Sequence, residues 1–439
     1  MARVLNQEML LPYFSGRDSI IEELKNNVEQ KLKNSQTPLR FASVATGTEG
    51  FFCEVESIEA SSSISSDLLS IFDFRKRIRN RTNEMNVVLM VPTGIDCVQG
   101  GHAGDATPIS KVMGSVCDNL IIHPNVVNAS DINEQPHNAL YVEGSLICRL
   151  MMGTIGLKKV HKNRVIVVTE KREDNWLVDQ VVNTASAARA VIGLNCPKVI
   201  VLDEVLDVKT VYSPSGRASG SISNIDKLVE ILKSESINYD AIALATKITP
   251  HMDSISLHQN YFKGESANPW GGAEAALTHA ISSILNVPSA HAPTMSDLNL
   301  RVESYGQVDP RKAAEVISMT YLTCVLKGLH NCPQVTTVSN GAYEPSELHA
   351  EDVDFLVVPD NCIGLPVIAA LAQGIKVIAV RSNSSLMKND ISLLPWNQGQ
   401  LISVSSYFEA AGVIASEKTG VDSSSTERPI SNTEVQYIG

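Results

Sequence analysis

From Asn86 onward, short apolar segments alternate with helical patterns, and this alternation restricts the fold more than any other feature of the chain. The apolar segments are rich in β-branched residues, as expected for parallel strands that are covered on both faces. We predict strands at 86–91, 119–122, 164–169, 198–202, 240–245, 354–358 and 376–380. Helical periodicity is clearest at 175–192, 225–233, 272–285 and 310–329.

Strands that alternate with helices are typical of βαβ units. We therefore predict an α/β fold with a doubly wound, mostly parallel sheet or sheets in two adjoining Rossmann-like lobes, and a small α+β domain before them. The α/β core should cover residues 86–419, with lobes at about 86–205 and 206–419. Residues 420–439 are rich in Ser, Thr, Glu and Asn, and we expect them to be a disordered tail.

The predicted N-terminal domain covers residues 1–85. It contains a helical pattern at 19–32 and two expected strands at 39–45 and 50–55. Its basic cluster at 75–81 could contact phosphate or RNA, but we interpret it as a solvated helix end because the whole chain is acidic.

Charge and cysteine usage restrict the class of protein. The 439 residues carry 48 acidic and 36 basic side chains, a net charge of −12, which argues against nucleic acid and anionic membranes as partners but not against small anionic ligands. The eight cysteines show no CxxC pair and no zinc spacing, which fits reduced, buried thiols. The first 18 residues lack a signal-peptide pattern, and no apolar run is long enough to span a membrane. We expect a soluble cytoplasmic protein, and a homo-oligomer is compatible with the sequence.

Glycines and polar side chains follow two expected strands, where ligands bind in open α/β sheets. These residues are Asp96, Gly100, Gly101, His102 and Asp105 after the first strand, and His123 and Asn125 after the second. Asp96, His102 and Asp105 could transfer protons, bind hydroxyl groups or hold a metal ion. The alternative is a tight turn in which Asp105 caps a helix. We favour a site, and we expect Asp105 and His123 to share one pocket.

The next segment, 128–144, carries Asn128, Tyr141 and Glu143. Partial burial beside Tyr141 could raise the pKa of Glu143 into a range useful for acid–base catalysis. The alternative is a surface loop in which Glu143 only caps a helix.

The segment 213–223 combines small residues with one arginine and precedes a predicted helix. Ser215, Gly216 and Arg217 could therefore cradle a phosphate or carboxylate at a helix N-terminus. A flexible connector has the same composition.

Two further helix openings carry polar groups. One contains Gly272 and Glu274 and leads to His279. The other contains Cys362, whose thiol pKa a helix N-terminus could lower, although a small residue buried under the turn is the simpler interpretation. The segment after Cys362 looks like part of the nucleotide-binding half of some glycosyltransferases.

Several motifs together resemble the domain-of-unknown-function 3326 family over about residues 87–422. The motifs are GGHAGDATPISKVMGSVCDNLIIHPNVVNAS, NALYVEG, GGAEAALTHAI, SAHAPTM, TCVLKGL and SYFEAAGVIASEKTGVD. No activity is established for this family, so the resemblance implies none. Motif positions are matched by Asp105, His123, Asn125, Asn128, Glu143, Ser215, Gly216, Glu274, His291 and Cys362. His102 and Ser289 depart from the family pattern, which has Tyr and Cys there, so the resemblance implies no base role for His102.

These observations favour an enzyme that acts on a small anionic, perhaps phosphorylated, metabolite by group transfer or acid–base chemistry at the carboxyl ends of strands. Catalysis is assigned to Asp105, His123, Glu143 and Cys362. Binding is assigned to Gly100, Gly101, His102, Asn125, Asn128, Ser215, Gly216, Arg217, Gly272, Glu274 and His291. The alternatives are a nucleotide-sugar glycosyltransferase and a non-catalytic ligand-binding or scaffold protein. No motif assigns a cofactor or metal.

Overall fold

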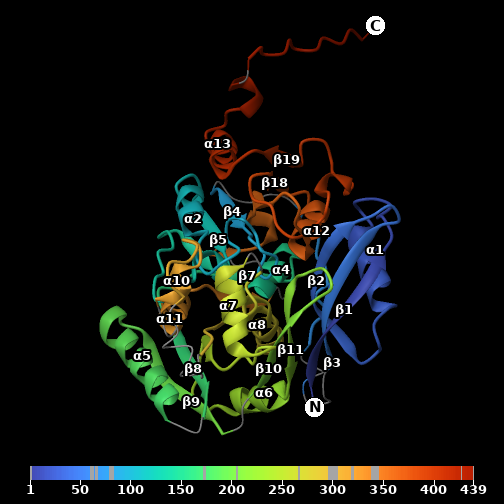
Figure 1. Cartoon of the computed structure of the whole chain (residues 1–439). Coiled ribbons are helices and arrows are strands. Elements are labelled where there is room, and N and C mark those ends of the chain that lie inside the picture. The colour runs from blue at the N-terminus through green and yellow to red at the C-terminus, as the bar shows by residue number, and fades with distance from the viewer. Residues whose placement is uncertain are drawn as a thin grey trace.

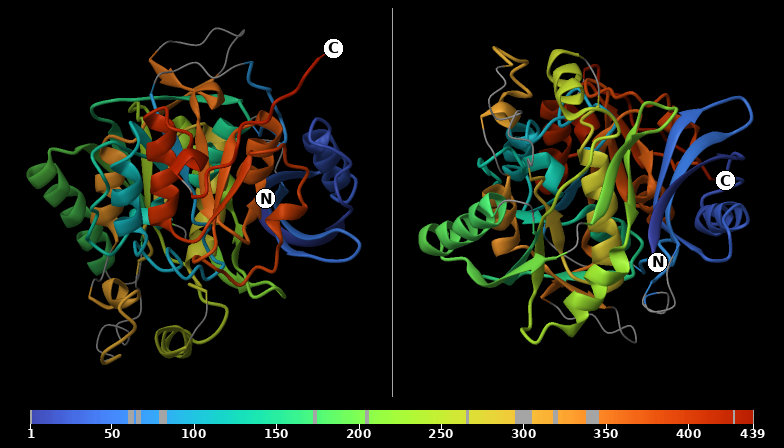
Figure 2. Two further views of the ribbon diagram at one scale, coloured as in Figure 1. Left: turned by 90° about the horizontal axis from the view of Figure 1, so that it is seen from above. Right: turned by 60° about the horizontal axis from the view of Figure 1, so that its bottom comes forward.

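The computed structural model describes residues 2–59, 64, 68–78, 84–171, 175–203, 206–264, 267–294, 305–317, 321–337, 346–426 and 428–438. The described residues form two parallel sheets, an antiparallel sheet that includes the N-terminal strands (Figure 1) and a smaller antiparallel sheet. In both views of Figure 2, α5 and α1 lie on opposite sides of the molecule, with the parallel strands between them.

The larger parallel sheet has the order β6-β5-β4-β16-β18-β19. Counted along the chain, these strands follow the order 3-2-1-4-5-6, so the order reverses between β4 and β16. The strands are β4 (Asn86–Leu89), β5 (Asn119–Ile122), β6 (Ala139–Tyr141), β16 (Phe355–Pro359), β18 (Lys376–Val380) and β19 (Leu401–Val404). The helices of this part are α2 (Thr107–Gly114), α3 (Pro124–Val127), α4 (Gly144–Met151), α12 (Leu365–Gln373) and α13 (Tyr407–Lys418).

The second parallel sheet has the order β13-β12-β8-β9. It consists of β8 (Arg164–Glu170), β9 (Asn195–Leu202), β12 (Ala241–Ala245) and β13 (Ser289–His291). Its helices are α5 (Trp176–Ile192), α6 (Ile225–Ser234), α7 (Ser254–Lys263) and α8 (Gly271–Leu285), followed by α10 (Ala313–Val316) and α11 (Leu322–His330). A small antiparallel sheet joins β14 (Gln334–Thr337), β7 (Ile155–Lys158) and β15 (Glu347–Leu348).

The third large sheet combines N-terminal strands with strands from the core, in the order β10-β11-β1-β3-β2-β17. Its members are β1 (Arg3–Leu11), β2 (Gln36–Thr46), β3 (Phe51–Glu59), β10 (Asp207–Tyr212), β11 (Ala218–Ser223) and β17 (Ile363–Gly364). Helix α1 (Ile20–Glu29) buries Ile20, Ile21, Leu24 and Val28. The N-terminal strands therefore share a sheet with the core, whereas the sequence suggested a separate domain at 1–85.

The strands also do not divide at the expected boundary between residues 205 and 206. Strands β8 and β9 pair within a sheet with β12 and β13, and β16 pairs with β4. A pattern along the chain shows where strands occur but not which strands pair. Residues 428–438 form no helix or strand, are exposed and extend away from the body (Figure 1).

Of the basic cluster at 75–81, residues 75–78 belong to the described chain. Arg77 donates hydrogen bonds to the carbonyl oxygens of Gln373 and Gly374 at the end of α12, and to that of Val353, which precedes β16. Lys76 pairs with Asp18 at 3.1 Å. These contacts give Arg77 a structural role, because helix C-terminal carbonyls need donors. Residues 73–78 form no helix, so the interpretation of the cluster as a helix end is wrong.

Candidate functional site

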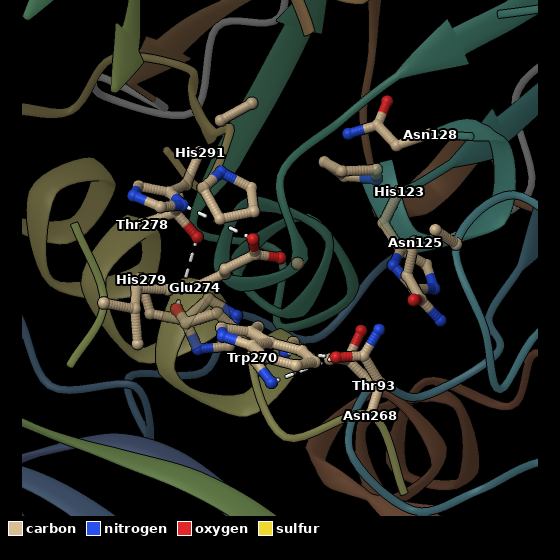
Figure 3. A pocket seen from close by; sticks show the side chains of 18 of the residues that line it. Thr93, His123, Asn125, Asn128, Asn268, Trp270, Glu274, Thr278, His279 and His291 are labelled. Atoms are coloured by element: carbon tan, nitrogen blue, oxygen red, sulfur yellow. Dashed lines mark hydrogen bonds and ion pairs between the residues drawn. The ribbon is translucent and has the colours of Figure 1, made fainter. Parts of the chain in front are cut away.

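A cavity of about 250 Å³ lies where the carboxyl ends of strands from both parallel sheets converge. Its wall includes segments after β4, β5, β6 and β12, the end of β13, the first turns of α8 and α12, and part of β2. Figure 3 shows His123, Asn125 and Asn128 on one side, facing His291, Glu274 and His279 on the other. The position agrees with the rule that ligands of open α/β sheets bind beyond the carboxyl ends of the strands.

His123 directly follows β5 and is buried. Its Nε2 accepts a hydrogen bond from the backbone N–H of Val91 at 3.2 Å, so the neutral ring carries its proton on Nδ1. Burial lowers the pKa of His123 to about 4. The side chain is therefore a neutral imidazole near pH 7, able to donate through Nδ1.

Glu143 and His279 form a buried pair. One carboxylate oxygen of Glu143 caps α4 by accepting from the N–H groups of Ser145 and Leu146. The other lies 3.1 Å from Nε2 of His279, which belongs to α8. Burial lowers the pKa of His279, and its Nδ1 has no hydrogen-bond partner among the described residues. Glu143 therefore caps a helix, as the alternative interpretation predicted. It also forms a carboxylate–histidine pair in the cavity wall.

A second carboxylate–histidine pair joins α8 to β13. Oε1 of Glu274 lies 3.5 Å from Nδ1 of His291, and Nε2 of His291 lies 3.0 Å from the hydroxyl of Thr246. The Glu274 side chain is 26% exposed, whereas His291 is buried. A carboxylate beside one ring nitrogen can orient an imidazole for proton transfer, as in many acid–base sites.

Two cations line the cavity. Arg40 of β2 donates to the carbonyl of Thr93 at 3.2 Å and to the carboxylate of Glu56 at 3.2 Å. Lys247 follows β12, is half-buried, and its Nζ has no ion-pair partner among the described residues. An incoming anion can therefore pair with Lys247 without displacing a carboxylate.

Glu315 of α10 also lines the cavity, although no sequence pattern indicated this residue. It accepts hydrogen bonds from the backbone N–H of Ala103, the hydroxyl of Tyr261 and the amide of Asn268. Burial raises the pKa of Glu315 to about 7. The contacts come from segments far apart in the chain, so only the folded structure could reveal them. Arg40 and Lys247 were missed for the same reason.

The structure brings only some of the predicted site residues to the cavity. Those that line it are His123, Asn125, Asn128, Glu143, Glu274 and His291. Those that do not are Gly100, Gly101, His102, Asp105, Ser215, Gly216, Arg217, Gly272 and Cys362.

Asp105 and His123 do not share this cavity, contrary to our expectation. The carboxylate of Asp105 turns back into its own loop and accepts the N–H of His102 at 3.2 Å. Burial raises the pKa of Asp105 to about 6. Asn125 holds the same loop through the carbonyls of Val91 and Gly100. Asp105 also does not cap α2 with its side chain, because the helix begins after Ala106 without a side-chain cap.

The anion cradle expected at 213–223 is wrong. Residues 218–223 are strand β11, and the preceding residues form the turn from β10. Arg217 is 1% exposed, its Nε donates to Glu54 at 2.5 Å and its Nη1 donates to Glu56 at 2.9 Å. Ser215 donates to the same Glu54 at 2.6 Å. These groups are occupied by each other and cannot receive an anion.

Gly272 and Cys362 have packing roles. A Cβ on Gly272 would lie 2.2 Å from the carbonyl oxygen of Ala218, so glycine allows α8 to pack closely on β11. Cys362 is buried outside the cavity, and its Sγ lies 3.7 Å from Oδ1 of Asn361. It precedes α12 by several residues, since that helix is capped by Gly364. The simpler interpretation of a small buried residue fits Cys362.

Comparison with known proteins supports the family resemblance. The model of a family described as a protein of unknown function (DUF3326) matches residues 86–427. An uncharacterised lipoprotein of Synechococcus sp. is 34% identical over 341 residues, which is 76% of this chain and 91% of the relative. No solved structure matches the chain. In the part of the chain that the structure describes, no helix is both long and apolar enough to cross a bilayer.

Proposed function

Since the chain belongs to the DUF3326 family, which brings no assigned activity, we propose its function from the site alone: an enzyme that acts on a small anionic metabolite by acid–base chemistry. The observation that carries the proposal is the convergence of His123, the Glu143–His279 pair and the Glu274–His291 pair on one cavity. A neutral imidazole opposite carboxylate-paired imidazoles supplies both a proton donor and a proton acceptor.

The anionic character of the ligand rests on Lys247, Arg40 and the N-terminus of α8. Trp270 and Gly271 at the start of α8 line the cavity, and a helix N-terminus carries partial positive charge. Lys247 adds a full charge without a carboxylate partner among the described residues. We further propose that the two parallel sheets are doubly wound, Rossmann-like lobes, because the larger sheet has the order 3-2-1-4-5-6, which is that of sheets that bind nucleotides and related phosphates.

Lys247→Ala is expected to weaken binding of the anion roughly ten- to a hundredfold, because a charge-assisted contact contributes about 1.5–3 kcal/mol. The measurement starts from a thermal-shift screen of phosphorylated and carboxylated metabolites, followed by titration calorimetry on the best ligand. Lys111→Ala is the matched control, since Lys111 is 53% exposed and pairs with Glu134 away from the cavity. Equal affinity of Lys247→Ala and wild type would contradict the proposed anion site.

A nucleotide-sugar transferase stays the alternative. Pro366, in the glycosyltransferase-like segment, lines the cavity, and the strand order reverses nearby between β4 and β16. In that case UDP would raise the melting temperature more than simple phosphorylated metabolites. Binding of an anion without turnover in any assay would instead favour the ligand-binding alternative.

We propose that the protein is cytoplasmic, and the alternative is a membrane-anchored form. A membrane-anchored form is supported by the name of the Synechococcus relative, which is called a lipoprotein. Fractionation of cells that express the natural gene separates the two, because an anchored protein sediments with the membranes and is released by detergent.

A further inference from the structure

A buried chain of hydrogen bonds leads from the cavity to the glycine-rich loop after β4. The hydroxyl of Tyr261, on α7, donates to Oε1 of Glu315 at 2.8 Å. Nδ1 of His102 lies 2.9 Å from the same hydroxyl. Beyond it, Nε2 of His102 lies 3.9 Å from Oδ1 of Asp96. Tyr261, Glu315 and His102 are each at least nine-tenths buried, whereas the Asp96 side chain is 19% exposed.

The direction of these bonds determines where the protons lie. Because Tyr261 donates its only hydroxyl proton to Glu315, His102 must donate to the Tyr261 oxygen through Nδ1. Burial lowers the pKa of His102 to about 4, so the ring is neutral near pH 7. Nε2 of His102 is then unprotonated and has no hydrogen-bond partner among the described residues. The distance of 3.9 Å to Asp96 is too long for a direct hydrogen bond and suits a bridging water.

Glu315 can change its protonation state under physiological conditions. Burial raises its pKa to about 7, and the nearby carboxylate of Glu274 acts in the same direction, whereas Lys312 lowers the pKa. Tyr321 and Tyr261 are the other titratable groups beside it, and Arg311 and Asp309 lie around the His102 end. A carboxyl group that lines the cavity thus exchanges its proton at neutral pH.

We propose that Glu315 exchanges protons with the ligand in the cavity and that Tyr261 and His102 relay them to and from the Asp96 side. When Glu315 is protonated, it donates to the Tyr261 oxygen, Tyr261 donates to Nδ1 of His102, and the neutral His102 carries its proton on Nε2. In the outward step from this state, Glu315 gives its proton to the Tyr261 oxygen, the Tyr261 hydroxyl gives its own to Nδ1 of His102, and His102 releases the proton on Nε2 through water to the Asp96 carboxylate. Glu315 is then a carboxylate, His102 is neutral with its proton on Nδ1, and Asp96 passes the proton on to solvent. The role of the relay in turnover rests on the proposed function.

The relay couples the charge of Glu315 to the tautomer of His102, and nitrogen-15 NMR of labelled histidine measures that tautomer without any ligand. The full-length protein is titrated from pH 5 to pH 9, and His102 is assigned by comparison with His102→Gln. We expect His102 to carry its proton on Nδ1 above about pH 7 and on Nε2 below it. The midpoint of this change in tautomer should coincide with the pKa of Glu315. The ring should stay neutral throughout this range.

Two variants test whether this chain of hydrogen bonds relays protons or has only a structural role. Tyr261→Phe preserves the aromatic packing and removes the connecting hydroxyl, and Glu315→Gln preserves size and removes the titrating group. Both should abolish the pH-dependent change at His102. An unchanged tautomer in the wild type, or the same switch in Tyr261→Phe, overturns the relay.

The outcome is separable from that of the proposed function. A tautomer switch in a protein that turns over none of the screened anions supports the relay and contradicts the enzyme proposal. Turnover without a switch at His102 overturns the relay and leaves the enzyme proposal intact.

Discussion

Replacing Arg217 with alanine should lower the free energy of unfolding by about 3–5 kcal/mol, because it leaves the buried Glu54 without its main ionic partner and the buried Glu56 with Arg40 alone. Glu54 and Glu56 are each 1% exposed, and both contact the Arg217 guanidinium. Although burial opposes ionisation, Arg40 and Arg217 hold the pKa of Glu56 at about 2. Urea denaturation of the full-length protein at pH 7 measures the effect.

The effect should also depend on pH in a defined direction. The folded-state pKa of Glu56 is depressed from 4.5 to about 2, so its ionic stabilisation is present above pH 4.5 and is lost as pH falls toward 2. The difference between wild type and Arg217→Ala should therefore shrink over this window.

Arg3→Ala is the matched control, since Arg3 also reaches a carboxylate of β3 from a neighbouring strand but is 55% exposed. Its loss should cost at most about 1 kcal/mol. If Arg217→Ala were as mild as Arg3→Ala and weakened an anionic ligand instead, the anion cradle that the sequence suggested would be correct after all.

Glu274→Gln should lower turnover of the anionic substrate by roughly 10²- to 10⁴-fold, the usual contribution of a positioned acid–base group. The amide keeps the size of the side chain but removes the carboxylate that lies 3.5 Å from Nδ1 of His291. The melting temperature should change little, because the Glu274 side chain is partly exposed. Initial rates with the best ligand of the screen provide the measurement.

A further Glu–His pair, outside the cavity, serves as a control. Glu347 lies 3.2 Å from Nε2 of His349 in the small antiparallel sheet, and neither residue lines the cavity. Glu347→Gln should leave turnover unchanged. Equal loss in both variants would mean that Glu274 acts through stability, and full activity of Glu274→Gln would remove the pair from the mechanism.

The sequence predicted those parts of the fold and site that depend on local pattern. Apolar β-branched runs located strands β4, β5, β8, β12, β16 and β18, and the polar groups after β5 and β6 led to His123 and Glu143. Both side chains line the cavity because carboxyl ends of parallel strands meet at one edge.

What the sequence missed depends on contacts between distant segments. The composition of 213–223 fits a ligand loop and a β-turn equally well, and only the pairing of β11 with β1 shows that Arg217 faces Glu54 and Glu56. Asp105 was misplaced because its loop folds back through glycines with positive φ at Gly100 and Gly104. No local pattern indicated that Glu315 would reach the cavity.

A crystal structure of the protein with the tightest-binding anion from the screen tests the central claim most directly. The claim predicts electron density for the ligand between His123 and His291, with its anionic group within hydrogen-bond distance of Nζ of Lys247 or of the first N–H groups of α8. Density for the ligand at the glycine-rich loop beside Asp105, with an empty cavity, would contradict the account.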